Sequence, residues 1–452
     1  MKSIPASEKF DERFDWFSVQ MGVTRLPADR DFIPLSHEIS FSDLLESMGI
    51  TGATDERSLR LGHIGPEGAV SEQPVQFISA PPEHRPDKDA PVRVAGELCW
   101  IARSDSTGQA KYLLWFGVPK DGVQIRVPYG PHHLRGFDSE GRATPVRWHQ
   151  SMQIRPQWPV NGAVNIYENK ELVTSYRTGP TLAEAGEGNC KIKRPFMYPL
   201  NGPDGISLTE FGKSHDPTGS HAHHYSLFVS HAAVNKRDFW SERSGELIVH
   251  RMFSLQEDGP ILCRLVQRTH WLSEDEPQMA GERTWTFHRA ADDFRLMDVE
   301  LRLESMGDEP VELGKTNFGF LAARMTPTLN PFDGGGEILN SRGDRNEQDA
   351  HEKQAEWIDQ SGPIAQDRWA GLAMFDHPSN PRHPTFWHCR NDGWAGASFC
   401  FADAFAIEPD QPLILNYRLH LHRHDSAEGE VAGRYEEYEA EPIIKLGKPQ
   451  RK

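Results

Sequence analysis

The sequence lacks paired cysteines, long apolar runs and an excess of basic residues, and each absence argues against a class of protein. Its five cysteines are scattered over 452 residues without a CxxC pair, so neither a disulfide framework nor a thiolate zinc site is indicated. No apolar stretch approaches the ~20 residues that a bilayer span requires, so no membrane partner is expected. Acidic residues outnumber basic ones by 66 to 49, a formal net charge of -17. Because no local basic face offsets that charge, a nucleic-acid partner is not expected either.

The composition is that of a globular protein with a substantial core. Hydrophobic residues make up 37% of the sequence and aromatic residues 10%, which excludes collagen-like and fully disordered chains. The length suggests two or three domains, or one large β domain with an accessory domain. The first 23 residues lack the basic and apolar regions of a secretory signal, so a cytoplasmic location is expected.

Residues 1–92 have the least regular pattern, and we expect an irregular N-terminal extension there. One short helix is predicted, because Ser40 and Asp43 form a capping-box pattern ahead of an apolar stripe that ends at Gly49. The proline-rich stretch 80–91 has the character of a linker. We therefore place a domain boundary near residue 92.

After this boundary, apolar residues recur at every second position, which is typical of strands with one buried face. Residues 112–118 form an apolar run, and apolar residues alternate over 123–127 after the turn-forming residues 119–122, so the two segments are expected to form a hairpin. The same alternation runs through residues 297–304.

Long helical patterns are nearly absent between residues 95 and 425, and many glycines and prolines supply turns. We therefore predict an all-β protein built as an antiparallel β-sandwich. Residues 93–160 would form an N-terminal β segment, and residues 161–445 the main sandwich domain.

Histidine, which titrates near neutrality and also binds metals, is concentrated in three short segments. Five of the 21 histidines lie in residues 215–231, three in 377–388 and three in 420–424. Such clustering marks a candidate functional surface. We expect the three segments to meet in one cleft, formed by His215, His221, His223, His388 and His422.

The first segment places His221 and His223 two residues apart. If residues 221–229 form a strand, these two imidazoles and Tyr225 share one face. They could then act as a general acid and base near neutral pH, or chelate a metal, although an HxH pair without an obvious third ligand is a weak metal signal. The alternative is that they are core histidines satisfied by backbone groups.

The second segment is an extended loop held by three prolines, and the third is a strand over residues 413–421. The loop offers candidate binding groups, namely His377, Arg382, His383, His388 and Arg390; the alternative is a solvated loop. The strand places apolar side chains on one face and Asn416, Arg418, His420 and His422 on the other. That second face is either an exposed outer face or part of a cleft shared with the other two segments.

Several ordered motifs lie at residues 193–205, 215–216, 221–227, 238–240, 375–378, 384–388 and 417–420. Together they resemble the uncharacterised bacterial family labelled methane oxygenase PmoA, over about residues 160–425. The resemblance implies a β-rich domain similar to the sugar-binding supersandwich of galactose mutarotases, in bacteria that degrade carbohydrates.

These observations favour an enzyme that acts on a small-molecule or oligosaccharide substrate derived from sugar, as a lyase, hydrolase or epimerase. His221 and His223 are the candidate acid and base, and loss of the His223 imidazole is expected to abolish turnover. The candidate substrate-binding residues are Arg194, His215, Lys315, His377, Arg382, His383, His388, Arg390 and His422. A metal-dependent oxygenase and a non-catalytic sugar-binding protein are the alternatives. No sequence motif identifies a cofactor or a metal, and the oligomeric state stays open.

Overall fold

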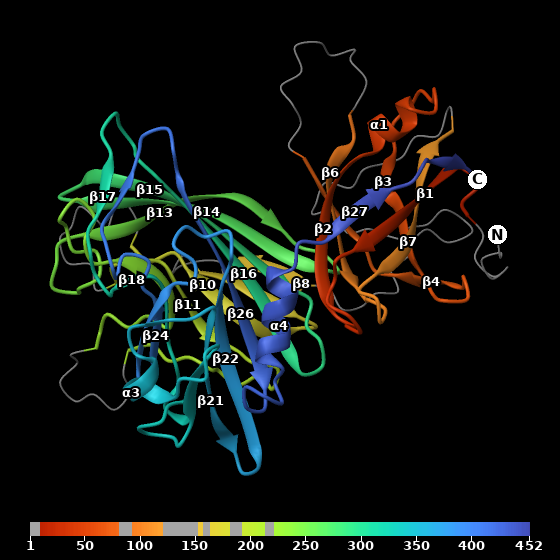
Figure 1. Ribbon diagram of the computed structural model, residues 1–452. Coiled ribbons are helices and arrows are strands. Elements are labelled where there is room, and N and C mark those ends of the chain that lie inside the picture. The colour runs from red at the N-terminus through yellow and green to blue at the C-terminus, as the bar shows by residue number, and fades with distance from the viewer. Residues whose placement is uncertain (1–9, 81–92, 121–151, 157–162, 181–191, 213–220) are drawn as a thin grey trace. The chain divides into compact units, whose positions relative to one another are not determined.

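Antiparallel β-strands make up most of the computed structural model, which describes residues 10–80, 93–120, 152–156, 163–180, 192–212 and 221–452. The described residues divide into two units (Figure 1). Unit 1 comprises residues 1–152, 257–262 and 440–452, and unit 2 comprises residues 153–256 and 263–439. The predicted all-β, antiparallel class is confirmed.

The described residues of unit 1 form two sheets and one helix. The larger sheet has the order β27-β1-β7-β3-β4, with β28 also paired to β1, and the smaller has the order β2-β6-β5. The elements are β1 (Phe14–Thr24), β2 (Ile33–Ser40), α1 (Phe41–Glu46), β3 (Asp55–Ile64), β4 (Val70–Gln73), β5 (Gln76–Ser79), β6 (Ala95–Ala102), β7 (Ala110–Pro119), β27 (Ile443–Leu446) and β28 (Gln450–Arg451).

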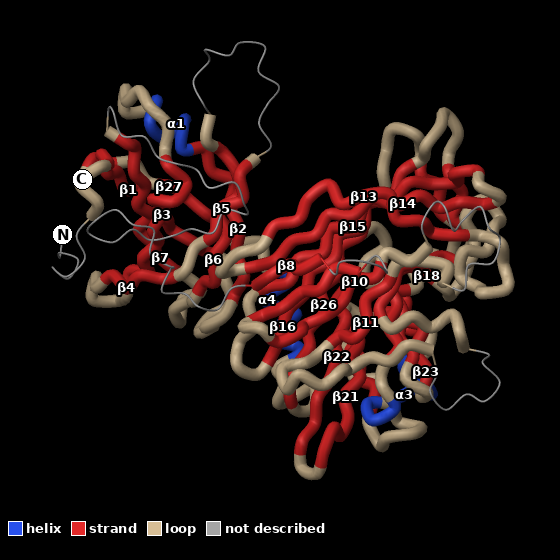
Figure 2. Tube along the Cα trace, turned by 180° about the vertical axis from the view of Figure 1, so that it is seen from behind, coloured by secondary structure: helices blue, strands red, loops and turns tan. Residues whose placement is uncertain are grey.

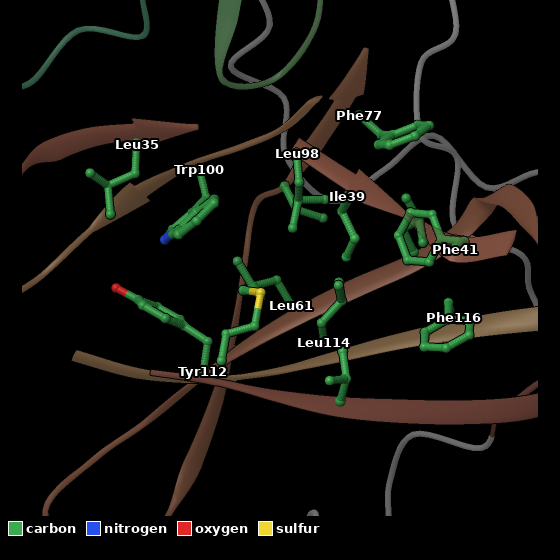
Figure 3. Close-up of a cluster of buried hydrophobic side chains, with 14 of the residues drawn as sticks. Leu35, Ile39, Phe41, Leu61, Phe77, Leu98, Trp100, Tyr112, Leu114 and Phe116 are labelled. Carbon is green, nitrogen blue, oxygen red and sulfur yellow. The ribbon is translucent and has the colours of Figure 1, made fainter. Parts of the chain in front are cut away.

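The core of unit 1 lies between these two sheets, where Leu98 and Trp100 of β6 approach Tyr112, Leu114 and Phe116 of β7 (Figure 3). All five are fully buried. Alternation along both strands delivers these side chains to one side, because successive residues of a strand point to opposite faces.

The predicted irregular extension is therefore wrong, since residues 14–79 contribute five strands to unit 1. The boundary near residue 92 and the separate β segment 93–160 also differ from the structure, because β6 and β7 pair with strands that precede residue 92. The predicted helix is present as α1, and Ser40 caps it by accepting a hydrogen bond from the Asp43 amide. The second strand of the predicted hairpin, at 123–127, lies outside the described residues.

Unit 2 is a β-sandwich of a nine-stranded and an eight-stranded sheet, and Figure 2 shows the strands as red tubes. The nine-stranded sheet runs in the order β20 (Lys353–Gln354), β23 (Phe386–Arg390), β24 (Trp394–Ala397), β18 (Gly319–Arg324), β12 (Leu227–His231), β11 (Phe196–Leu200), β10 (Glu171–Arg177), β9 (Ala163–Glu168) and β8 (Met152–Pro156). The eight-stranded sheet runs in the order β13 (Leu247–Glu257), β14 (Leu262–Ser273), β15 (Glu276–His288), β16 (Phe294–Glu304), β26 (Leu413–Arg423), β22 (Arg368–Asp376), β21 (Trp357–Ala365) and β19 (Glu337–Asn340).

Short elements complete unit 2. Strands β17 (Val311–Leu313) and β25 (Phe405–Ile407) form a two-stranded sheet, and the helices among the described residues of this unit are η1 (Pro327–Leu329), α3 (Asn346–Ala350) and α4 (Val431–Glu439). Within the described part of the chain, no helix is long and apolar enough to cross a membrane.

Side chains of the eight-stranded sheet donate hydrogen bonds to backbone carbonyls of the nine-stranded sheet. Arg283 bonds to Val229 at 3.4 Å and Gln360 to Trp394 at 3.0 Å, so these side chains point into the space between the sheets. The predicted alternation in β16 is confirmed, because Met297, Val299, Leu301 and Leu303 are all buried. The predicted β-sandwich is thereby confirmed for this unit.

Candidate functional site

The outer face of the nine-stranded sheet carries a group of aromatic rings and imidazoles. The register pairs Phe228 with Ala322, Ala322 with Gly396, and Gly396 with His388, so these positions share one face of β12, β18, β24 and β23. The alternate positions Leu227 and Val229 are fully buried on the opposite, core side. The group therefore points away from the interior of the sandwich.

Two tryptophans form the base of this group. The rings of Trp240 and Trp394 lie 5.4 Å apart at 83°, in an edge-to-face arrangement, and Phe228 contacts both. Trp240 and Trp394 are 5% and 2% exposed, whereas Phe318, whose ring lies 5.3 Å from that of Trp240, is 36% exposed. Solvent therefore reaches the aromatic group at Phe318, whereas the two tryptophans are almost completely covered.

His221 and His223 lie in a turn, so the strand predicted over 221–229 is wrong in its first half. The amide of His224 donates to the His221 carbonyl at 3.0 Å, which closes the turn, and β12 begins only at Leu227. Ser226, with a φ of 63°, makes the change of direction between the turn and the strand. The simple alternation expected for His221, His223 and Tyr225 therefore does not apply.

The turn nevertheless brings three imidazoles together. The ring of His223 lies 4.3 Å from that of His224 and 6.1 Å from that of His221. His224 is buried and stacks on Trp394 at 4.2 Å and 20°. His221 and His223 are partly exposed above it.

His388 joins the same group from β23. Its ring lies 6.4 Å from Trp394 and 5.1 Å from Phe318, and its Nδ1 lies 3.3 Å from the Asn317 carbonyl. His351 packs on its other side at 5.0 Å. We call His221, His223, His224, His388, Trp240 and Trp394 together the histidine–tryptophan cluster.

Arg194 supports this cluster from within. Its side chain is fully buried and its Nη2 donates to the Trp240 carbonyl at 2.7 Å and to Glu242 Oε1 at 3.1 Å. A weaker bond runs from Nη1 to the His223 carbonyl at 3.4 Å. The guanidinium also lies over the rings of Tyr225 and Phe228. Arg194 therefore fixes the backbone that carries two cluster residues.

Burial keeps three imidazoles of the cluster, those of His223, His224 and His388, uncharged at neutral pH because it lowers their pKa values. Burial and then the positive charge of Arg194 lower the pKa of His223 to about 4. Burial and then His351 lower the pKa of His388 to about 4, and burial holds the pKa of His224 well below its usual range. Neutral imidazoles at these positions can accept a proton or a hydrogen bond but do not carry a positive charge.

The third histidine segment lies in the other sheet, so the predicted convergence of all three segments is wrong. His422 of β26 faces Asp359 of β21, with Nε2 2.9 Å from the Asp359 carboxylate. Gly371 leaves room for this ring, since a Cβ there would come within 2.5 Å of it. His420 and His422 are buried, so the polar face of this strand, which is the outer face of its sheet, is covered at these two residues and not exposed. Burial alone would lower the pKa of His422, but Asp359 raises it above its ordinary value.

The other predicted binding residues have local partners outside the cluster. His383 pairs with Asp376 at 2.8 Å, and Arg382 donates to the carbonyls of residues 399, 403 and 404. Both side chains therefore hold the loop between β22 and β23 in place. Arg390 pairs with Glu347 and is half exposed. Nδ1 of His377 lies 2.7 Å from the Ser379 hydroxyl. His215 lies outside the described residues, and Lys315 is exposed before β18.

The sequence did not single out Trp240, Trp394, His224 or His351 as site residues. Trp240 belongs to the motif at 238–240, which was used for the family resemblance but not to predict a site residue. His351 and Trp394 stand alone in sequence, and only the pairing of β23 with β24 brings Trp394 near His388. Among the described residues, no three His, Cys, Asp or Glu side chains are grouped as a metal site requires.

A model of the family of unknown function DUF6807 matches residues 163–436. Because this range covers more than half of the 452 residues, the chain belongs to that family. The expected membership of the family labelled methane oxygenase PmoA is wrong, since the matching family has no such name and no assigned function.

Two solved structures have limited similarity to the chain. A glycosyl hydrolase family 38 protein from Enterococcus faecalis is 10% identical, with a TM-score of 0.39, over 97% of this chain and 48% of that one. A heparinase III is 12% identical, with a TM-score of 0.28, over 69% of this chain and 43% of that one. The chain thus spans less than half the length of each. No curated protein matches the sequence.

Proposed function

We propose that this protein is an enzyme that acts on a carbohydrate, and that the histidine–tryptophan cluster is its active site. The observation that carries the proposal is the placement of the partly exposed, uncharged imidazole of His223 beside His224, which stacks on Trp394, with the buried cation Arg194 behind them. Aromatic rings pack against the apolar faces of sugar rings, and imidazole nitrogens meet the hydroxyl groups.

His223 is the proposed proton acceptor. Its ring is partly exposed, so a ligand can reach it, and its pKa of about 4 keeps it in the accepting form throughout the neutral range. Proton abstraction from a sugar carbon or hydroxyl leaves negative charge on the substrate. The positive field of Arg194, which already lowers the pKa of His223, favours that charge.

This chemistry suits a lyase or an epimerase better than a hydrolase. Glycoside hydrolysis commonly uses two carboxylates that flank the scissile bond. Glu242 is held by Arg194, and burial raises its pKa. The cluster itself offers imidazoles, which serve reactions that begin with loss of a proton.

Binding and proton exchange test the proposal together. The protein would be incubated in D2O with a panel of glycosides, keto-glycosides and uronides, and deuterium incorporation and product formation followed by NMR. Quenching of the intrinsic tryptophan fluorescence, to which Trp240 and Trp394 contribute, reports binding. We expect one sugar class to exchange a proton or to be converted, and His223→Gln to slow the reaction by ~10²- to 10⁴-fold.

His270→Gln is the matched control, because His270 is a partly exposed histidine of β14 in the other sheet. It should leave the rate within about twofold of the parent. Equal rates for parent and His223→Gln would contradict the role of His223. Sugar binding without exchange or conversion across the panel would identify a binding protein instead, and no binding at all would remove the carbohydrate assignment.

A further inference from the structure

A cavity of about 580 Å³ opens on the outer face of the eight-stranded sheet, away from the histidine–tryptophan cluster. Its base is formed by β14, β15, β16 and β26, and the residues that line it include Arg264, Thr284, Asp298, Glu300, His377 and Tyr438. A volume of this size is typical of small-molecule sites. The catalytic proposal above does not use it.

The register places the polar lining on the outer face. Asp298 pairs with Thr286 on one side and with Arg418 on the other, so their side chains share a face. The neighbouring positions Val299 and Tyr417 are buried on the side that faces the core. The cavity and the histidine–tryptophan cluster therefore lie on the outer faces of two different sheets.

The charges at the base of the cavity balance locally. Asp298 accepts bonds from Arg418 at 2.5 Å and 2.8 Å, and Nε2 of His288 lies 2.7 Å from the same carboxylate. Arg264 and Glu300, which carry opposite charges, also line the cavity. Because both signs of charge are present, neither a cation nor an anion is favoured throughout the cavity, whereas a neutral ligand that donates and accepts hydrogen bonds can bind beside both.

One wall of the cavity is aromatic. The ring of Tyr438, from α4, lies 4.6 Å from the Arg418 guanidinium and 4.8 Å from the His377 ring. Because Nδ1 of His377 lies 2.7 Å from the Ser379 hydroxyl, Nε2 is the ring nitrogen that can meet a ligand. Hydroxyl, amide and carboxylate groups beside one aromatic wall match the alternating hydroxyls and apolar face of a sugar ring.

We infer that this cavity is a second binding site, which takes a neutral mono- or disaccharide and is independent of the catalytic cluster. Thr284 and Glu300 offer a hydroxyl and a carboxylate from adjacent strands, and their Cα atoms are directly paired. A sugar seated there would hydrogen-bond across the strand pair and pack against Tyr438. The inference does not depend on the proposed catalysis, since binding here requires no turnover.

The test is isothermal titration of the full chain with maltose, cellobiose and lactose, and with glucuronate as the charged comparison. Parent and His223→Gln should bind at least one neutral disaccharide with a Kd on the order of 1 mM. Thr284→Phe, which fills the base, and Glu300→Ala, which removes an acceptor, should each weaken binding by ~tenfold or more. Glu304→Ala is the matched control, because Glu304 lies four residues further along β16 and is not among the lining residues.

Circular dichroism would confirm that each variant is folded, and Glu300→Ala provides the test if Thr284→Phe does not fold. The inference is overturned if parent and His223→Gln bind no neutral sugar, if glucuronate binds more tightly, or if Glu304→Ala loses as much affinity as Glu300→Ala. Binding that is lost in His223→Gln and kept in Glu300→Ala would place the sugar at the catalytic cluster. That result overturns the second site and supports the proposed function.

Discussion

Replacing Arg194 with methionine should destabilise unit 2 and raise the pKa of His223. The guanidinium is fully buried, and the substitution leaves the Trp240 carbonyl without the donor that now lies 2.7 Å away. A buried acceptor left unpaired costs ~1–3 kcal/mol. Losing the ion pair adds to the cost, because the Glu242 side chain is only 19% exposed and would keep its charge without the buried cation beside it.

Methionine fills a similar volume and removes the cost of burying a charge, which offsets part of the loss. We therefore expect the free energy of unfolding to fall by ~2 kcal/mol. Urea denaturation followed by tryptophan fluorescence measures this change. NMR titration of the imidazoles should show the pKa of His223 rising from about 4, because Arg194 is one cause of its lowering.

Arg390→Met is the matched control. Arg390 also forms one ion pair, with Glu347 at 2.6 Å, but its side chain is 51% exposed. Its loss should cost less than ~1 kcal/mol and leave His223 unchanged. The reasoning is refuted if Arg194→Met is as stable as the parent or if the pKa of His223 stays the same.

Three further predictions concern stability. The free energy of unfolding should fall as pH drops from ~6.5 to ~4, because the buried imidazoles of His231 and His388 each have a pKa of about 4. The unfolded chain binds these two protons first, so each histidine costs ~1.4 kcal/mol per pH unit in this range. Urea midpoints at pH 7 and pH 4.5 would show this, and His231→Gln should reduce the difference; an unchanged difference would contradict it. Asp298→Asn should cost ~3 kcal/mol, because Arg418 would remain buried without its carboxylate partner; a melting temperature equal to that of the parent would exclude this role. Ser40→Ala should cost ~1 kcal/mol in unit 1, since it removes the cap of α1, and hydrogen exchange of the α1 amides would report the loss or show that the cap does not matter.

The strands of unit 2 were predictable because their side chains alternate. Over residues 297–304 of β16 the apolar positions are buried and the polar positions are partly or fully exposed, so the period of two alone gives the correct element there. β1 has similar alternation, with Phe17, Val19, Met21 and Val23 buried, but its polar neighbours and its position near the N-terminus obscured it. The return of β27 and β28 to pair with β1 could not be predicted, because no local pattern specifies a partner more than 400 residues away.

The candidate site was predictable only in part. Histidine density identified the segment that holds His221 and His223, and the structure places the predicted His388 of the second segment beside Trp394, on which His224 stacks. The prediction for the third segment failed because the polar face of a strand can be buried, as at His422, which pairs with Asp359 and occupies the room that Gly371 leaves. Trp394 was missed because its contact with His224 depends on which strands are neighbours in the sheet.

The most direct test of the catalytic assignment is the pH dependence of kcat/KM for parent and His223→Gln on the converted sugar. If His223 is the proton acceptor, kcat/KM of the parent falls on the acid side with an apparent pKa of about 4, and the variant is ~10²- to 10⁴-fold slower without that acid limb. An acid limb that persists unchanged in His223→Gln, at the rate of the parent, would contradict the assignment.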